Sequence, residues 1–216
     1  MSKKKSYFLA IAIPYYKNSE QCEKAFKKLM EQLNKQLTDD MFLYVYEDGQ
    51  FSNWLWEYAQ NKPQNIKIES NAKNRGVSFA RNKMLNYLID KSEYILYIDS
   101  DDYVDDNYLK VMYEYCADMT HEIIECTYID YHKKFTFEKD KVRSGISGVA
   151  FKTSIVGDNR FDENRQIGED TDFSYRVFDL KKYRKKLAKT TYYYQYGVNP
   201  NSLMKRYKRK EIGEMR

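Results

Sequence analysis

The chain has 216 residues, of which 42% are hydrophobic and 32% charged, and its formal net charge is +5. This balance excludes a wholly disordered chain, which combines low hydrophobicity with a large net charge. Because it has only eight glycines and three prolines, the chain is also neither collagen-like nor linker-like. The length predicts one domain, or one domain with a small appendage.

The cysteines and the N-terminal residues bear on location. Three widely spaced cysteines without a CxxC motif predict neither a disulfide framework nor a zinc site, which suits a reducing compartment. The basic residues 3–5 and the apolar run 7–13 imitate a secretory signal, but Pro14 ends the run and no small-residue cleavage site follows. No stretch reaches the ~20 apolar residues of a membrane-spanning helix. We expect a soluble cytoplasmic protein and leave open a peripheral place at a membrane surface.

The first half of the chain alternates strands and helices. Runs rich in aromatic and β-branched residues predict strands over 7–13, 42–46, 66–69 and 94–98. Apolar residues at three- and four-residue steps predict helices over 22–37, over 78–90 and from about residue 106. This alternation implies parallel βαβ units. The ligand of such a sheet, expected here to be a nucleotide, lies beyond the carboxyl ends of the strands.

The second half has a different pattern. It predicts an antiparallel pair over 123–129 and 134–137, a loop marked by Gly145 and Gly148, a helix over 170–182 and a strand over 190–196. The fold class is therefore α/β: a three-layer α/β/α, Rossmann-like domain with a mixed, mostly parallel central sheet and a small antiparallel second sheet. We divide this single domain, residues 1–216, into a nucleotide-binding half (1–104), an acceptor-binding half (105–203) and a basic C-terminal tail (204–216).

The strongest local signal is a cluster of acids directly after the predicted strand 94–98, formed by Asp99, Asp101 and Asp102. Crowded carboxylates repel one another, and a divalent cation relieves this repulsion. Mg²⁺ in particular uses one or two carboxylates and completes its coordination with phosphates and water. The cluster therefore predicts a site for a cation and a diphosphate. Helix capping by Asp102 and the acids after it is the alternative.

Two other acidic pairs follow from the same pattern. Glu47 and Asp48 end the second strand at the same edge of the sheet, where they could accept hydrogen bonds from a base or a ribose. Glu169 and Asp170 open a predicted helix, where the helix dipole favours carboxylates. Asp170 could cap this helix or act as the general base for an acceptor hydroxyl.

Five segments, in this order, resemble the family 2 glycosyltransferases of the GT-A fold, and the resemblance covers about residues 8–203. Pro14-Tyr15-Tyr16-Lys17-Asn18 resembles the family's Pro-x-Tyr-Asn turn, and Tyr46-Glu47-Asp48-Gly49 its second strand end. The next two are similar to the family's Asn-x-Gly with Ala-Arg-Asn and to its Asp-x-Asp motif, namely Asn74-Arg75-Gly76 with Ala80-Arg81-Asn82, and Asp99-Ser100-Asp101. Glu169-Asp170 is similar to the family's Glu-Asp pair.

The resemblance implies an inverting enzyme that moves a sugar from a nucleotide-diphosphate sugar, with a UDP-sugar as the first expectation, to an acceptor hydroxyl. It implies that Mg²⁺ or Mn²⁺ is held by Asp101 with Asp99, that Asp170 is the catalytic base, and that Glu169 orients it or contacts the acceptor. The implied donor-binding residues are Pro14, Tyr15, Tyr16, Asp48, Asn74, Arg81, Asp99 and Ser100. The family often has a histidine near the metal, whereas residues 194–202 contain none.

Two basic tracts, Lys181–Lys189 and Lys205–Lys210, could hold an anionic acceptor such as a lipid-linked glycan, an acidic polysaccharide or a nucleic acid. A solvated helix face and a frayed tail are the simpler interpretation. Trp54 and Trp56, in an expected polar loop, could line the donor pocket or pack in the core. The alternative functions are a non-catalytic nucleic-acid-binding module, which leaves the carboxylates unexplained, and a glycoside hydrolase, which the motif order disfavours.

Overall fold

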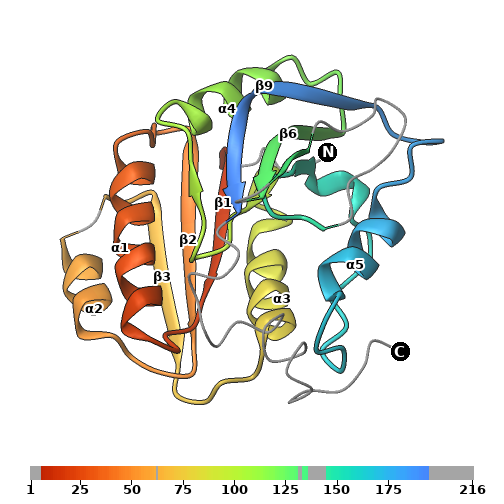
Figure 1. Ribbon diagram of the computed structural model, residues 1–216. Coiled ribbons are helices and arrows are strands. Elements are labelled where there is room, and N and C mark those ends of the chain that lie inside the picture. The colour runs from red at the N-terminus through yellow and green to blue at the C-terminus, as the bar shows by residue number, and fades with distance from the viewer. Residues whose placement is uncertain (1–5, 62, 131–132, 136–144, 195–216) are drawn as a thin grey trace.

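The structure is a computed structural model that describes residues 6–61, 63–130, 133–135 and 145–194. Figure 1 shows helices on both sides of one twisted sheet. The elements, in chain order, are β1 (Tyr7–Tyr15), α1 (Glu20–Asn34), β2 (Met41–Asp48), α2 (Asn53–Gln60), β3 (Ile66–Asn71), α3 (Val77–Leu88), β4 (Ser92–Tyr97), β5 (Tyr103–Val104), α4 (Tyr108–Ala117), β6 (Ile123–Asp130), β7 (Lys133–Phe135), β8 (Ala150–Lys152), a 3₁₀ turn (Thr153–Ile155), α5 (Glu169–Val177) and β9 (Lys185–Tyr194).

Within the described residues, the nine strands form one sheet in the order β3-β2-β1-β4-β8-β6-β9-β5, and β7 pairs with β6. The first four of these strands are parallel, as the βαβ pattern predicts. The predicted antiparallel pair is confirmed as β6 and β7, and it continues the central sheet through β8. The α/β fold with a mixed sheet is therefore confirmed.

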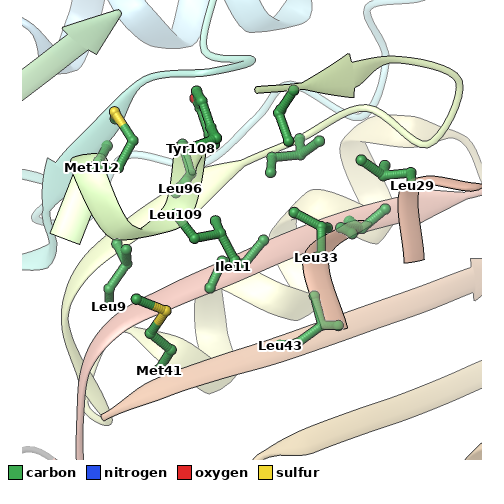
Figure 2. Close-up of a cluster of buried hydrophobic side chains, with 14 of the residues drawn as sticks. Leu9, Ile11, Leu29, Leu33, Met41, Leu43, Leu96, Tyr108, Leu109 and Met112 are labelled. Atoms are coloured by element: carbon green, nitrogen blue, oxygen red, sulfur yellow. The ribbon is translucent and has the colours of Figure 1, made fainter. Parts of the chain in front are cut away.

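The sheet has an apolar cluster on each of its two faces, because successive residues of a strand point to opposite faces. On one face Leu9, Ile11 and Leu43 pack against α1 and α4, and Figure 2 shows this cluster with Leu33 from α1 among its members. The other face of the same strands packs against α3 and α5. Helices on both faces give the three layers predicted from the sequence.

Two elements differ from the sequence-based prediction. Residues 53–60, expected as a polar loop, form helix α2, whose Leu55 and Trp54 pack on the core while Trp56 is exposed. The last predicted helix ends at Val177 and not at residue 182. The carboxylate of Asp179 accepts the amide hydrogen of Lys181 at 3.0 Å, and this local bond competes with the helical one.

The basic tract Lys181–Lys189 is therefore not a helix face. Its last five residues belong to β9, which begins at Lys185 and not at residue 190. Lys185 is paired with the buried Glu125 on β6 at 3.1 Å, and Arg184 lies 3.7 Å from Glu122. Part of the tract's charge is thus used inside the fold. The second basic tract, Lys205–Lys210, lies outside the described residues.

Candidate active site

The carboxyl ends of β1, β2 and β4 lie at one edge of the sheet because these strands are parallel and in register. This edge brings together the turn after Tyr15, the acid Asp48 and the acids that follow β4. Arg81 on α3 and Glu169 at the start of α5 contact the same edge from the second helical layer. The candidate site is therefore assembled from both halves of the chain.

Arg81 joins two of the predicted acids. Its guanidinium donates to the Oε1 of Glu169 at 2.6 Å and to the Oδ1 of Asp99 at 3.1 Å. Only 4% of Arg81 is exposed, so both ion pairs are shielded from water. The hydroxyl of Tyr97 donates to the carbonyl oxygen of Arg81 at 3.0 Å and fixes its backbone. Arg81 thus connects the Asp-x-Asp loop to the helix that carries Asp170.

Two residues that the sequence analysis did not single out complete this network. The hydroxyl of Ser147 donates to the second oxygen of Asp99 at 2.6 Å. The hydroxyl of Tyr192 accepts the amide hydrogen of Asp99 at 3.1 Å and donates to the carboxylate of Asp102 at 2.5 Å. Asp102 therefore shapes the acidic loop from inside. A buried tyrosine on a late strand carries no sequence signal for such a role.

The charges of this network influence one another. The carboxylates of Asp99, Glu169 and Asp170 raise the pKa of Arg81, although burial alone would lower it. Burial raises the pKa of Glu169, with a further increase from the neighbouring Asp170, while Arg81 opposes the change. Arg81 therefore stays charged, and Glu169 binds its proton more readily than a free glutamate.

The raised pKa of Glu169 predicts a pH dependence of stability. A carboxyl whose pKa is higher in the folded state contributes stability that is present below its unfolded pKa and is lost as pH rises through the folded pKa. Relative to Glu169→Gln, the wild type is therefore expected to lose stability from about pH 4 upward. Urea unfolding at several pH values measures this difference, and a gap that is constant or that changes in the opposite direction contradicts it.

Asp170 lies at the first turn of α5, which begins after Gly168 in the left-handed conformation. Its Oδ1 accepts the amide hydrogen of Thr171 at 2.8 Å, so the cap-like interpretation holds for this oxygen. The other oxygen, Oδ2, faces Gly145, where any Cβ in place of the glycine hydrogen would lie only 2.8 Å away. Gly145 also has a φ of +99°, which other residues rarely adopt. A larger residue at this position would therefore be disfavoured both by its backbone conformation and by its contact with Asp170.

Asp48 holds the loop that leads into α3. Its carboxylate accepts amide hydrogens from Arg75 and from Gly76, the latter at 2.7 Å, and only 4% of the residue is exposed. Asn74 is exposed and bonds the amide of Gly76 at 2.9 Å. Gly49, with a φ of +105°, packs so closely on Asn74 that a Cβ would lie 2.7 Å from it. Asp48 and Asn74 therefore form one corner of the edge, whereas Glu47 is fully buried beneath Ser52 and Ser70.

The structure separates the residues of the Pro-x-Tyr turn. Pro14 is buried in β1, and Tyr15, only 1% exposed, packs its ring on Phe26 with a centroid distance of 4.3 Å. The predicted donor contact of the Tyr15 side chain is therefore corrected to a core position, since a buried ring offers no face to a ligand. Tyr16 is 44% exposed and presents its ring to solvent.

Asp101 and Ser100 lie in the turn after β4, and both are partly exposed. Asp101 also acts on the thiol of Cys22, whose pKa is raised first by burial and further by Asp101, so this carboxylate lies near the start of α1. Both oxygens of Asp99 already accept hydrogen bonds. In the part of the chain that the structure describes, no three His, Cys, Asp or Glu residues gather as a metal site. The residues present fit a cation held by one carboxylate with phosphate and water.

No helix of the described residues is long and apolar enough to cross a membrane. The described part of the chain includes His121, which lies 3.7 Å from the carboxylate of Asp118 at the surface, away from the acidic loop. His132 lies outside the described residues, as does the segment 195–202, where the family often has a histidine.

Comparison with known proteins gives a family and a fold. The sequence model described as glycosyl transferase family 2 matches residues 10–206. No curated protein sequence matches the chain significantly.

Three solved structures illustrate the likeness of fold. A crystal structure of residues 1–349 of S. aureus TarS has 19% identity and a TM-score of 0.69, and the match covers 87% of this chain and 60% of that one. The same fragment in complex with UDP-GlcNAc matches with 18% identity and a TM-score of 0.69, over 87% and 58% of the two chains. The mannosyltransferase PcManGT from Pyrobaculum calidifontis, in complex with GDP-Man and Mn²⁺, has 13% identity and a TM-score of 0.66, over 96% and 65%. This chain therefore spans about 60% of the TarS fragment.

Proposed function

This chain belongs to glycosyl transferase family 2, and from that premise we propose that it transfers a sugar from a nucleotide-diphosphate sugar to an acceptor hydroxyl by a single inverting displacement. One observation carries the proposal: Arg81 bonds both Asp99 of the Asp-x-Asp loop and Glu169, which precedes Asp170. The acids of two distant motifs thus serve one site. The TarS and PcManGT structures were solved with UDP-GlcNAc and GDP-Man, which supports a nucleotide sugar as donor.

The donor lies, in this proposal, across the edge formed by the ends of β1, β2 and β4. Tyr16 has an exposed ring on which a base can stack, whereas the ring of Tyr15 is enclosed. Asp48 holds the neighbouring loop by accepting the amides of Arg75 and Gly76, and the exposed side chain of Asn74 in that loop is the group that can bond the base. Asp99, oriented by Ser147 and Arg81, faces the ribose. A UDP-sugar is the donor we expect first.

The diphosphate leaves with an additional negative charge, which the site has to stabilise. Asp101 is the residue we assign to Mg²⁺ or Mn²⁺, and a cation bound there would act as a Lewis acid on the diphosphate. The charge of Asp101 adds to the effect of burial in raising the pKa of the Cys22 thiol in the first turn of α1, and the free amide groups of a helix start would favour phosphate. Asp99 contributes mainly by orienting the loop, since Arg81 and Ser147 use its oxygens.

The acceptor hydroxyl loses a proton as it attacks. We assign this proton to the Oδ2 of Asp170, the oxygen that faces Gly145, because the Oδ1 is used by the amide of Thr171. Attack from the side opposite to the diphosphate then inverts the anomeric carbon without a covalent intermediate. Glu169 positions the base through Arg81.

A nucleic-acid-binding module is the second candidate from the sequence. The acids at the sheet edge argue against it, because Asp48, Asp99 and Asp101 would repel a phosphate backbone that is not bridged by cations. The basic tract Lys181–Lys189, on which it depends, uses Lys185 and Arg184 in pairs with buried or partly buried glutamates. We therefore retain the enzyme.

A thermal-shift panel of nucleotide sugars, with and without Mg²⁺ or Mn²⁺, tests the donor assignment. A ligand that binds the folded state raises the melting temperature in proportion to the logarithm of its concentration over Kd. We expect one nucleotide sugar to stabilise the protein more with the cation than without it. Uniform absence of stabilisation across UDP-, GDP- and other nucleotide sugars would contradict the proposal.

Replacing Asp101 by alanine is expected to remove the cation-dependent part of that stabilisation while leaving the fold intact, because Asp101 is partly exposed. Asp106→Ala is the matched control, since Asp106 is an exposed acid that follows the same loop. Calorimetric titration of Mn²⁺ in the presence of the nucleotide sugar measures the effect. An unchanged response in Asp101→Ala, or an equal loss in the control, removes Asp101 from the metal assignment.

A further inference from the structure

The loop that joins β2 to α2, residues 49–52, is fixed to both neighbouring strands of the sheet. The amide of Gly49 donates to the Oδ1 of Asn71, at the end of β3, at 2.8 Å. The Nε2 of Gln50 donates to the carbonyl oxygen of Lys17, in the turn after β1, at 2.6 Å. The loop is therefore held from both sides at the carboxyl end of the sheet.

A buried carboxylate holds the last residue of this loop. Glu47, only 1% exposed, accepts the amide hydrogen of Ser52 at 3.0 Å and also its hydroxyl hydrogen. Its other oxygen accepts the hydroxyl hydrogen of Ser70 on β3 at 3.1 Å. Burying a carboxylate is unfavourable unless hydrogen bonds compensate for the lost water. Glu47 takes no part in the reaction proposed above, so its buried charge serves to fix the loop.

Phe51 is the one residue of this loop without such an anchor. Its ring is 63% exposed and contacts no other ring within the described residues. Phe51 precedes the N-cap Ser52, and an apolar residue at this position often packs against the fourth residue of the helix, here Trp56. Trp56 is itself 67% exposed, and it makes no ring contact with Phe51. Helix capping and core packing therefore do not account for Phe51.

A second exposed ring lies on the neighbouring segment. β1 and β2 are parallel with Tyr15 beside Glu47, so the chain after β1 leaves the sheet next to the loop 49–52. Tyr16, in that segment, is 44% exposed and is stacked on no other ring in the part of the chain that the structure describes. The hydrogen bond from Gln50 to Lys17 joins the two segments. Two aromatic rings with accessible faces thus lie side by side along the chain edges where the proposed donor binds.

We propose that Phe51 is a base-binding residue, whose ring stacks on the nucleobase of the donor on the face opposite to Tyr16. The side chain of Asn74, which can bond a base, lies in the loop on which Gly49 packs, so all three groups come from segments that meet at this edge. A ring held on a fixed loop loses little freedom when a ligand binds. Stacking tolerates any base, so Phe51 increases the affinity for a nucleotide without choosing the base.

This inference rests on the proposed function, and calorimetric titration of the purified chain tests it. The ligands are UDP, GDP, ADP and CDP, with inorganic pyrophosphate as the ligand without a base, each in the presence of Mn²⁺. We expect Phe51→Ala to weaken the nucleoside diphosphate that wild type binds best by about tenfold, the scale of one stacking contact. The affinity for pyrophosphate should be unchanged, and the fold should be intact because the ring is exposed.

Three further variants separate stacking from other effects. Phe51→Trp keeps an aromatic face and should retain the affinity, whereas Phe51→Leu keeps apolar bulk without that face and should lose as much as Phe51→Ala. Tyr175→Ala is the matched control, since Tyr175 is a 69% exposed ring on α5, and it should leave every affinity unchanged.

Several results would overturn the assignment of Phe51. They are full affinity in Phe51→Leu, an equal loss for pyrophosphate, an equal loss in Tyr175→Ala, and an unchanged affinity in Phe51→Ala, which would leave the ring as a contact for another protein. Wild type that binds none of the four nucleoside diphosphates would count against the proposed function itself. Wild-type binding that Phe51→Ala does not alter would count against Phe51 alone.

Discussion

Asp170→Asn is expected to lower the rate of glycosyl transfer by at least ~10²-fold while the nucleotide sugar still stabilises the protein. An amide cannot take the proton of the acceptor hydroxyl, yet it keeps the shape of the carboxylate and the bond from Thr171. Transfer assays under saturating donor and acceptor, together with donor-dependent melting temperatures, separate these two effects.

The matched control is Asp172→Asn. Asp172 lies in the same first turn of α5 but bonds Arg176 at the helix surface, at 2.8 Å. It should retain nearly all of the activity, because an exposed ion pair of this kind contributes little. Equal activity of the two variants, or full activity of Asp170→Asn, would remove Asp170 from the role of base.

Arg81→Met is the substitution for which we expect the largest loss of stability, about 3–5 kcal/mol of the free energy of unfolding. The variant leaves the carboxylates of Glu169 and Asp99 without their buried cation, while methionine fills much of the space of the arginine. Urea unfolding followed by circular dichroism measures the difference.

Two further variants test whether the loss of stability comes from the ion pairs of Arg81. Arg81→Met combined with Glu169→Gln should recover part of the lost stability, because the second change removes one of the stranded charges. Arg75→Met, in the exposed loop just before α3, should cost less than about 1 kcal/mol even though the Arg75 guanidinium lies 3.7 Å from the centroid of the Phe79 ring. A small effect of Arg81→Met, with no recovery in the double variant, would show that the bridge carries little energy.

The periodicity of apolar residues was sufficient to predict the first four strands and the helices α1 and α3, because burial on one or both faces sets these patterns directly. The start of α1 follows the same local chemistry, since the hydroxyl of Ser19 caps the helix by accepting the amide hydrogen of Cys22 at 3.2 Å. Helix α2 was not predicted, because Trp54 and Trp56 are two residues apart and a spacing of two does not place side chains on one helix face. Its start lacks a side-chain cap bond, and the Ser52 hydroxyl is used by Glu47.

The site shows the same division between local and distant information. Asp48, Arg81, Asp99 and Glu169 were predicted from short motifs, and the structure brings them to one sheet edge. Ser147 and Tyr192 were not predicted, since their contacts with the acidic loop join residues 48 and 93 positions apart. The motif implied donor contacts for both Tyr15 and Tyr16, and it carries no signal that the ring of Tyr15 points into the core while that of Tyr16 is exposed.

The path of Tyr192 has a consequence for how the chain acquires its structure during translation. Its hydroxyl supports Asp99 and Asp102, and its ring fills the space that Gly148 leaves open. A ribosome therefore has to release β9 before the acidic loop receives its buried support. Until then, the growing chain has an acidic loop that lacks its hydrogen bonds to Tyr192. We expect chaperones to bind the nascent chain at that stage.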